Sequence, residues 1–310
     1  MNEPDGDEKI GNEDLYRALK LVVVNYDHNN NKKTGHGTGF IVRSHAGNSR
    51  FGDSFLVTNR HVVDRAYRTY PFDTKDRWLQ SSIESIEVKG HFQYPRDEVP
   101  TPESVSLKIH NPEPVYPRDE DIDIAVIALS PHGTGSSEPN FHTFDIMKLQ
   151  DHHDIIDGAI QVGSPLLMPG YPQLGQEVSD RPILVGGWIA SDPRYSASMG
   201  GADFPRRILG HSFSRAGMSG APVLSLLPPK LDWKGEPRGA RLTLLGINTG
   251  HVVIANAPSV MSQFVPAPAI LSTIARAGDE FAVKNVRHTL KYPEHREVMP
   301  ETLWLPEPLD

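Results

Sequence analysis

The chain of 310 residues contains no cysteine, which excludes disulfide bonds, thiolate zinc sites and cysteine nucleophiles together. It also lacks any apolar run near the roughly 18 residues that a membrane-spanning helix needs. The longest strongly apolar stretch covers only residues 124–129. We therefore expect no membrane partner.

Positive charge is also scarce. The chain has 31 basic and 39 acidic residues, a net charge of −8, and no dense Lys/Arg block. A nucleic-acid partner is not expected, because such binding needs a basic surface for the phosphates. Residues 1–14 are acidic and expected to be flexible, whereas a secretory signal is basic and then apolar. We expect a cytoplasmic protein, with a periplasmic or secreted location as the alternative if a signal was removed.

Short segments rich in β-branched residues and bounded by turn residues fill most of the chain, as is typical of barrels and sandwiches. A first series of strands is expected at residues 21–26, 39–42, 55–58, 83–88, 104–109 and 122–129. A second series is expected at residues 164–168, 183–190, 207–209, 222–226, 242–248 and 251–254. Only residues 12–20, with Asn12 as N-cap, and residues 268–277 have the pattern of helices.

A stretch rich in Gly, Ser and Pro near residues 131–140 predicts a boundary between two β-domains. The expected organisation is a first β-domain over 15–135, a linker over 136–160, a second β-domain over 161–278 and a Pro-rich tail over 279–310.

The segment GMSGAPV places Ser219 between Gly217 and Gly220, directly before an apolar strand. Glycines allow a sharp turn with positive φ, which can aim the amides of Gly217 and Ser219 at one point as an oxyanion hole. A serine in a tight turn is also a common structural feature, so the motif needs partner residues before it indicates catalysis.

Two further residues have the surroundings that a nucleophilic serine requires. His61 follows the strand FLVTN, although a histidine beside two valines is often only a packed residue. Asp123 begins an apolar strand, where a carboxylate needs a donor such as a histidine N–H. Asp121 is the competing candidate, and we prefer Asp123 because it adjoins the apolar run.

With these residues in order, the sequence resembles the bacterial trypsin-like serine peptidases of the chymotrypsin fold, in particular their HtrA-like and glutamyl-endopeptidase branches. The matching segments are GTGFIV (37–42), TNRHVV (58–63), DIDIAV (121–126), GMSGAPV (217–223), LLGINTG (244–250) and FVPAPAI (264–270).

The resemblance implies an all-β chain of two packed six-stranded antiparallel β-barrels with a C-terminal helix. It places His61 and Asp123 on the first barrel and Ser219 on the second, as the catalytic triad of a serine endopeptidase acting on proteins or peptides. Met218 stands where secreted animal members have an Asp that receives a freed N-terminus, so that activation switch should be absent. No PDZ module and no cofactor are expected.

By family position, substrate-binding residues would be Phe213 and Ser214 before the nucleophile, and Asn248, Thr249 and Gly250 on the pocket strand. None of them is a carboxylate, which disfavours cleavage after Arg or Lys. Asn248 stands where glutamyl endopeptidases have a histidine. We expect a preference for a small or medium uncharged side chain.

Three alternatives were weighed. An α/β-hydrolase needs the order Ser, acid, His and many crossover helices, which this chain lacks. A protease-fold scaffold that binds peptides without cutting them is the non-enzymatic alternative. An enzyme whose activity stays latent until a protein partner or a loop rearrangement activates it is preferred to this scaffold. The segment DHHD at 151–154 is read as a solvated loop rather than a metal site, because it lacks HExxH spacing.

Overall fold

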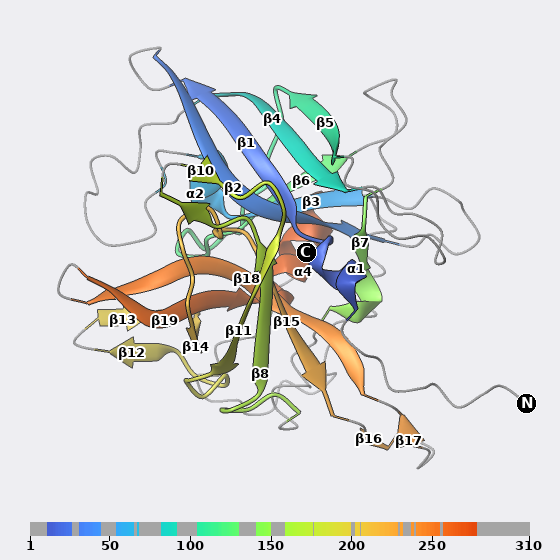
Figure 1. The fold of residues 1–310 in the computed structure, drawn as a ribbon, viewed down its shortest axis with the longest axis vertical. Helices are drawn as coiled ribbons and strands as arrows, with labels where there is room; N and C mark the ends of the chain where they lie inside the picture. Colours follow the sequence, from blue (N-terminus) through green and yellow to red (C-terminus); the bar gives the residue numbers. More distant parts are fainter. Residues whose placement is uncertain are drawn as a thin grey trace, which may run out of the picture.

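The fold consists of two β-structured halves, drawn from blue to green and from green to orange in Figure 1. Both halves are seen in a computed structural model of the chain. It describes residues 11–26, 31–44, 54–64, 67, 82–91, 104–129, 141–149, 159–175, 177–199, 202–204, 206–228, 230–231, 237–238, 240–254 and 257–277.

The first half is a seven-stranded sheet. Its strands are β1 (Leu19–Tyr26), β2 (Lys32–Arg43), β3 (Ser54–Thr58), β4 (Ser82–His91), β5 (Ser104–His110), β6 (Ala125–Leu129) and β7 (Thr143–Asp145). Six of them pair antiparallel in the order β5-β4-β1-β2-β3-β6, and β7 pairs parallel to β2. Within the described residues this sheet is open at β5 and β6.

The second half is a closed antiparallel barrel. Its strands are β8 (Pro165–Gly170), β11 (Ile183–Ile189), β14 (Ile208–Ser212), β15 (Pro222–Leu227), β18 (Arg241–Ile254) and β19 (Ala257–Pro266). Their order is β11-β14-β19-β18-β15-β8. Short pairs extend its loops: β9 (Gln173–Leu174) with β10 (Glu177–Val178), β12 (Ala197–Met199) with β13 (Ala202–Phe204), and β16 (Lys230–Leu231) with β17 (Pro237–Arg238).

Within the described residues, helices are few and short. They are α1 (Asn12–Leu15), α2 (Arg60–Val63), the 3-10 turn η2 (Ile146–Lys148) and the C-terminal α4 (Ala267–Ala277). Helix α4 contacts β6 of the first half as well as β18 and β19 of the second. Its buried Ile270 and Ile274 join one apolar cluster with Phe40 and Val126 of the first sheet and Leu244 of the barrel. Burial of each such side chain contributes about 1.5–3 kcal/mol, so α4 fastens the two halves together.

The all-β class, the closed six-stranded second barrel and the C-terminal helix are thus confirmed. The first half, expected as a six-stranded barrel, is instead a seven-stranded sheet that is open within the described residues. The helix expected at 12–20 is wrong. Helix α1 ends at Leu15, and β1 begins at Leu19 with alternating buried and half-buried residues. Its cap is Gly11 rather than Asn12, and the Gly11 N–H donates to the Asp14 carboxylate (3.0 Å). Pairing of β1 with both β2 and β4 outweighs the local helical preference.

Two strand predictions also need correction. The segments 242–248 and 251–254 form one strand, β18, whose register shifts around Gly250. Strand β19 was not predicted, because its Pro and Ser residues hide the pattern. The domain boundary near 131–140 and the DHHD segment lie outside the described residues.

Candidate active site

His61 and Asp123 form a hydrogen-bonded pair in the first half. The His61 Nδ1 atom lies 2.6 Å from Asp123 Oδ2, and the His61 backbone N–H donates to Asp123 Oδ1 (3.0 Å). Asp123 is fully buried, whereas His61 is half-buried on α2. A carboxylate that accepts both bonds fixes the ring orientation and leaves Nε2 available to a reacting group. The side chain of Asp121 is exposed.

Two buried polar side chains, Asn59 and Tyr67, hydrogen-bond to the backbone around Asp123. The Asn59 amide donates to the Asp123 carbonyl (2.8 Å), which ties the start of α2 to the segment before β6. The Tyr67 hydroxyl donates to the Glu120 carbonyl (2.7 Å). Burial, and then the nearby Asp123 charge, raise the pKa of Tyr67 well above its usual range. Tyr67 therefore stays neutral beside the carboxylate.

A buried arginine of the second half reaches the same region. Arg207, 2% exposed, donates to the Gln263 side-chain oxygen (3.0 Å) and to the Asp121 carbonyl (3.4 Å). Its positive charge lowers the pKa of Tyr67, opposing the effect of Asp123. Arg207 thus places a cation near Tyr67 and binds the second half to the first.

Ser219 lies in the turn between β14 and β15. The Met218 N–H donates to the Arg215 carbonyl (3.0 Å) and the Gly220 N–H to the Asn248 carbonyl (2.9 Å). Among the described residues, the N–H groups of Gly217 and Ser219 have no hydrogen-bond partner. The turn thus leaves free the two donors expected of an oxyanion hole.

The Ala216–Gly217 peptide is held in one orientation. Its carbonyl accepts the Gln173 N–H at 2.7 Å. The carbonyl and N–H of a trans peptide point in opposite directions, so the Gly217 N–H points away from Gln173. Gly217 has φ +85°, which is favourable only for glycine. The direction of this candidate oxyanion donor therefore depends on the β9–β10 hairpin.

Thr38 of β2 joins the nucleophile turn to the first sheet. Its hydroxyl donates to the Gly217 carbonyl (2.7 Å) and accepts the Tyr171 N–H (3.1 Å). Its backbone N–H donates to the Ser219 carbonyl (2.8 Å), and the residue is fully buried. One residue thus fixes the carbonyls on both sides of Met218.

The structure brings the Ser219 turn beside the His61 helix. A Cβ on Gly37 would meet Val62 Cγ1 at 2.7 Å and the Ser219 carbonyl oxygen at 3.4 Å, so both contact the same glycine. Among the described residues, no hydrogen bond joins the Ser219 hydroxyl to His61. Catalytic hydrogen bonds are often long before substrate binds.

The five residues expected to bind substrate differ in how exposed they are. Phe213 is 45% exposed, and the Arg215 guanidinium lies 4.6 Å from the centre of its ring. Ser214, Asn248 and Thr249 are buried. The Asn248 amide donates to Ser214 Oγ (3.0 Å) and to the Met218 carbonyl (2.8 Å), so these two hydrogen bonds hold the nucleophile turn against β18. Gly250, with φ +134°, pairs with Gln263 directly after the register shift at Thr249.

A trypsin-like peptidase domain matches residues 37–226, which span the His61, Asp123 and Ser219 segments. The chain belongs to the trypsin-like peptidase family. As a member of this family it is a serine endopeptidase, and its substrates are proteins or peptides.

Solved structures with similarity to this peptidase include Deg5 (17% identity, TM-score 0.43, 84% of this chain and 87% of that chain covered). The Rv3671c protease of M. tuberculosis in its active form has 17% identity and a TM-score of 0.42, with 88% of each chain covered. The HtrA-type protease AlgW with a tripeptide has 18% identity and a TM-score of 0.42, with 81% of this chain and 56% of that chain covered. No curated protein matches the sequence.

Neither a metal cluster nor a membrane helix is found in the part of the peptidase that the structure describes. No three His, Asp or Glu side chains there lie close enough to hold a metal ion. No helix there has the length and apolar character needed to cross a membrane.

Sequence reasoning missed three residues that position the peptidase's site. Thr38 lies in the quoted GTGFIV segment, but its role does not show there, since its partners Tyr171 and Gly217 are 133 and 179 residues away along the chain. Asn59 directly precedes α2, a usual capping position, and that signal was available. Arg207 begins an apolar strand, where a buried charge signals a specific partner.

Replacing Thr38 with Val should destabilise the peptidase. Valine keeps the shape but removes the hydroxyl, leaving the buried Gly217 carbonyl and Tyr171 N–H without their partner. Each orphaned buried group costs about 1–3 kcal/mol, so the free energy of unfolding should fall by about 2–4 kcal/mol. Urea unfolding in a Ser219→Ala background, which prevents self-digestion, measures the change. Thr38→Ser, which keeps the hydroxyl, is the matched control, and equal losses in the two variants would contradict this role.

Proposed function

We propose that this serine endopeptidase hydrolyses peptide bonds through Ser219, His61 and Asp123. The observation that carries the proposal is the pair of unpaired N–H groups beside the Ser219 hydroxyl, on a turn that adjoins the buried His61–Asp123 pair. Each of these groups has the surroundings that its step requires.

In the first step, Ser219 Oγ attacks the peptide carbonyl carbon while His61 Nε2 takes the hydroxyl proton. Asp123 stabilises the resulting imidazolium through its bond to Nδ1. The Gly217 and Ser219 N–H groups donate to the carbonyl oxygen as it becomes an anion.

Collapse of this intermediate breaks the C–N bond, and His61 passes the proton to the leaving amine. An acyl-enzyme remains on Ser219. A water molecule then attacks the ester carbonyl, His61 takes its proton and returns it to Ser219, and the acid product leaves.

A fluorophosphonate probe tests this proposal, because it reacts only with an activated serine. With cell extract present to supply the activating partner, wild-type protein should be labelled and Ser219→Ala should not. Ser198→Ala, which removes an exposed serine hydroxyl of β12, is the control and should be labelled like the wild type. Equal labelling of Ser219→Ala and wild type would overturn the assignment.

The uncharged preference at the cleaved position belongs to the same proposal. Phe213 supplies an exposed aromatic surface, and the neighbouring Arg215 guanidinium disfavours a second cation there. No carboxylate stands among the five expected substrate-binding residues to attract Arg or Lys.

We further propose that a protein partner activates the enzyme. The Ser219 hydroxyl makes no hydrogen bond to His61 among the described residues, so the triad is complete only when substrate or a partner brings these two groups together. Casein turnover with and without cell extract distinguishes this from a silent peptide-binding scaffold. A scaffold would show no turnover and no probe labelling, whether or not cell extract is present.

A further inference from the structure

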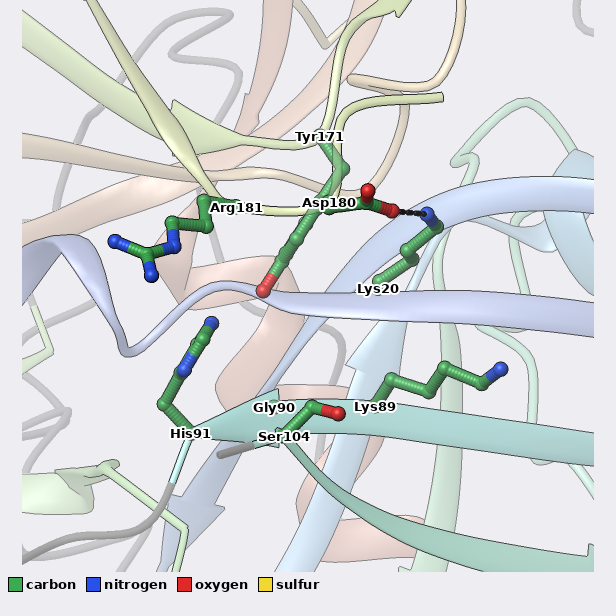
Figure 2. Close-up of a pocket in the computed structure, with 8 residues that line it drawn as sticks. All are labelled: Lys20, Lys89, Gly90, His91, Ser104, Tyr171, Asp180 and Arg181. Carbon is green, nitrogen blue, oxygen red and sulfur yellow. Dashed lines mark hydrogen bonds and ion pairs between the residues drawn. The ribbon is translucent and has the colours of Figure 1, made fainter. Parts of the chain in front are cut away.

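A cavity of about 270 Å³ lies between the first sheet and residues 171–181 of the second half. Figure 2 shows its lining, which includes none of the three proposed catalytic residues. Lys20 comes from β1, Lys89 and His91 come from β4, and Tyr171 and Arg181 come from the opposite wall.

The cavity gathers hydrogen-bond donors that lack acceptors. The Tyr171 hydroxyl points between His91 and Arg181 in Figure 2. Tyr171 is 1% and His91 4% exposed, and His91 packs edge-on against the Tyr16 ring (4.8 Å). Within the described ranges, neither these two side chains nor Arg181 has a hydrogen-bond or ion-pair partner. Arg181 is exposed, and the polar atoms of the two buried side chains are not sealed from solvent, so a ligand would replace water on these groups.

The charge of the cavity favours an anion. Three cationic side chains line it against one carboxylate, Asp180, in a chain whose net charge is −8. Asp180 is fully exposed and lies 3.4 Å from Lys20 Nζ, and Lys89 lies 3.3 Å from Glu87, so Arg181 holds the uncompensated charge. Burial lowers the pKa of His91, and the charge of Arg181 lowers it further. An anion between His91 and Arg181 would remove that repulsion.

The wall that carries Tyr171 and Arg181 also controls the nucleophile turn. Lys20 Nζ donates to the Val178 (3.3 Å) and Ser179 (3.1 Å) carbonyls, and the Ser179 N–H donates to the Pro172 carbonyl (3.0 Å). The next residue, Gln173, orients the Ala216–Gly217 peptide. A ligand that joins this wall to the first sheet would therefore steady the candidate oxyanion donor.

We propose that this cavity binds an oxyanion, a carboxylate or phosphate group, through His91, Tyr171 and Arg181, and that its occupancy increases turnover by fixing residues 171–181. The binding step stands alone, and only the effect on turnover rests on the proposed function.

Binding is measured on Ser219→Ala by NMR titration of backbone amides at constant ionic strength. The probes are inorganic phosphate, the acidic peptide Ac-Asp-Glu-Asp-NH₂ and its neutral counterpart Ac-Asn-Gln-Asn-NH₂. We expect saturable shifts in residues 171–181 with phosphate or the acidic peptide, and none with the neutral peptide. Saturation by phosphate indicates a free or esterified phosphate ligand. Saturation by the acidic peptide alone indicates a carboxylate segment.

Arg181→Gln and Tyr171→Phe should each weaken binding about tenfold or more, because each removes a hydrogen bond to a charged group. Arg194→Gln, an equal loss of charge at an exposed arginine paired with Asp192, should leave binding within twofold. Equal weakening by Arg181→Gln and Arg194→Gln, or saturation by none of the probes, would overturn the site.

Turnover is measured on the wild type with the same probes. Saturable binding should raise kcat about threefold or more, in line with better alignment of one oxyanion donor. Binding with unchanged kcat in a probe-reactive enzyme would refute the coupling to the turn. Absence of serine labelling together with intact binding would instead refute the proposed chemistry and leave the site standing.

Discussion

Replacing Asp123 with Asn should lower kcat about 10³–10⁴-fold while leaving the fold intact. The Asn amide would fill the same buried space but cannot accept both bonds that the carboxylate accepts from His61. An NH₂ group facing Nδ1 makes that nitrogen an acceptor, so Nε2 carries the proton and cannot take another from Ser219. Peptide hydrolysis under saturating substrate measures the loss, and thermal unfolding confirms that the variant is folded.

Asp121→Asn is the matched control, since it makes the same chemical change two residues away on an exposed side chain. Its kcat should stay within about threefold of the wild type, in line with a solvated surface position. A large loss in Asp121→Asn with little loss in Asp123→Asn would reassign the acid of the triad.

Replacing Gly217 with Ala should lower kcat about 10²–10³-fold, the usual cost of one lost oxyanion donor. An alanine Cβ would lie 2.4 Å from the Tyr171 carbonyl oxygen and 3.2 Å from the Gln173 nitrogen. The turn must move to relieve this clash, and the Gln173 bond that orients the Ala216–Gly217 peptide would be lost. Hydrolysis of a peptide ester, compared with thermal unfolding, separates the catalytic loss from destabilisation.

Gly163→Ala controls for the backbone conformation. Gly163 has φ +87°, close to the value at Gly217, but a Cβ there meets nothing within 4 Å. Both variants should lose about 1–2 kcal/mol of stability from the left-handed conformation, and only Gly217→Ala should also lose turnover. Similar kcat values for the two variants would show that the orientation of this peptide is not used in catalysis.

Much of the fold could be predicted from local patterns. Strands such as β1 and β3 are marked by β-branched residues between turn residues, and α4 by a proline in its first turn and an apolar period. The end of α1 could not be predicted, because Leu19 and the residues after it form a strand that pairs with β2 and β4, which are distant in sequence. The helical preference of these residues is weak compared with pairing that buries one face of the strand.

The candidate site was predictable where a residue's role shows in its own segment. His61, Asp123 and Ser219 each stand in a recognisable motif, and the structure adds the hydrogen bonds that hold the first two together. The roles of Thr38, Gln173 and Arg207 depend on contacts between the two halves, which no local pattern encodes. Sequence therefore indicates the chemical groups, and only the packing of the halves shows what orients them.

The hydrogen bonds of Thr38 to the nucleophile turn have a consequence for synthesis of the chain. Strand β2 emerges from the ribosome long before the Ser219 turn, so a partly made chain contains His61 and Asp123 without the proposed nucleophile. Once the turn emerges, its carbonyls still need Thr38 of the earlier half for their hydrogen bonds. With the proposed triad, docking of the two halves should therefore precede hydrolysis, and nascent or separated halves should not digest their neighbours.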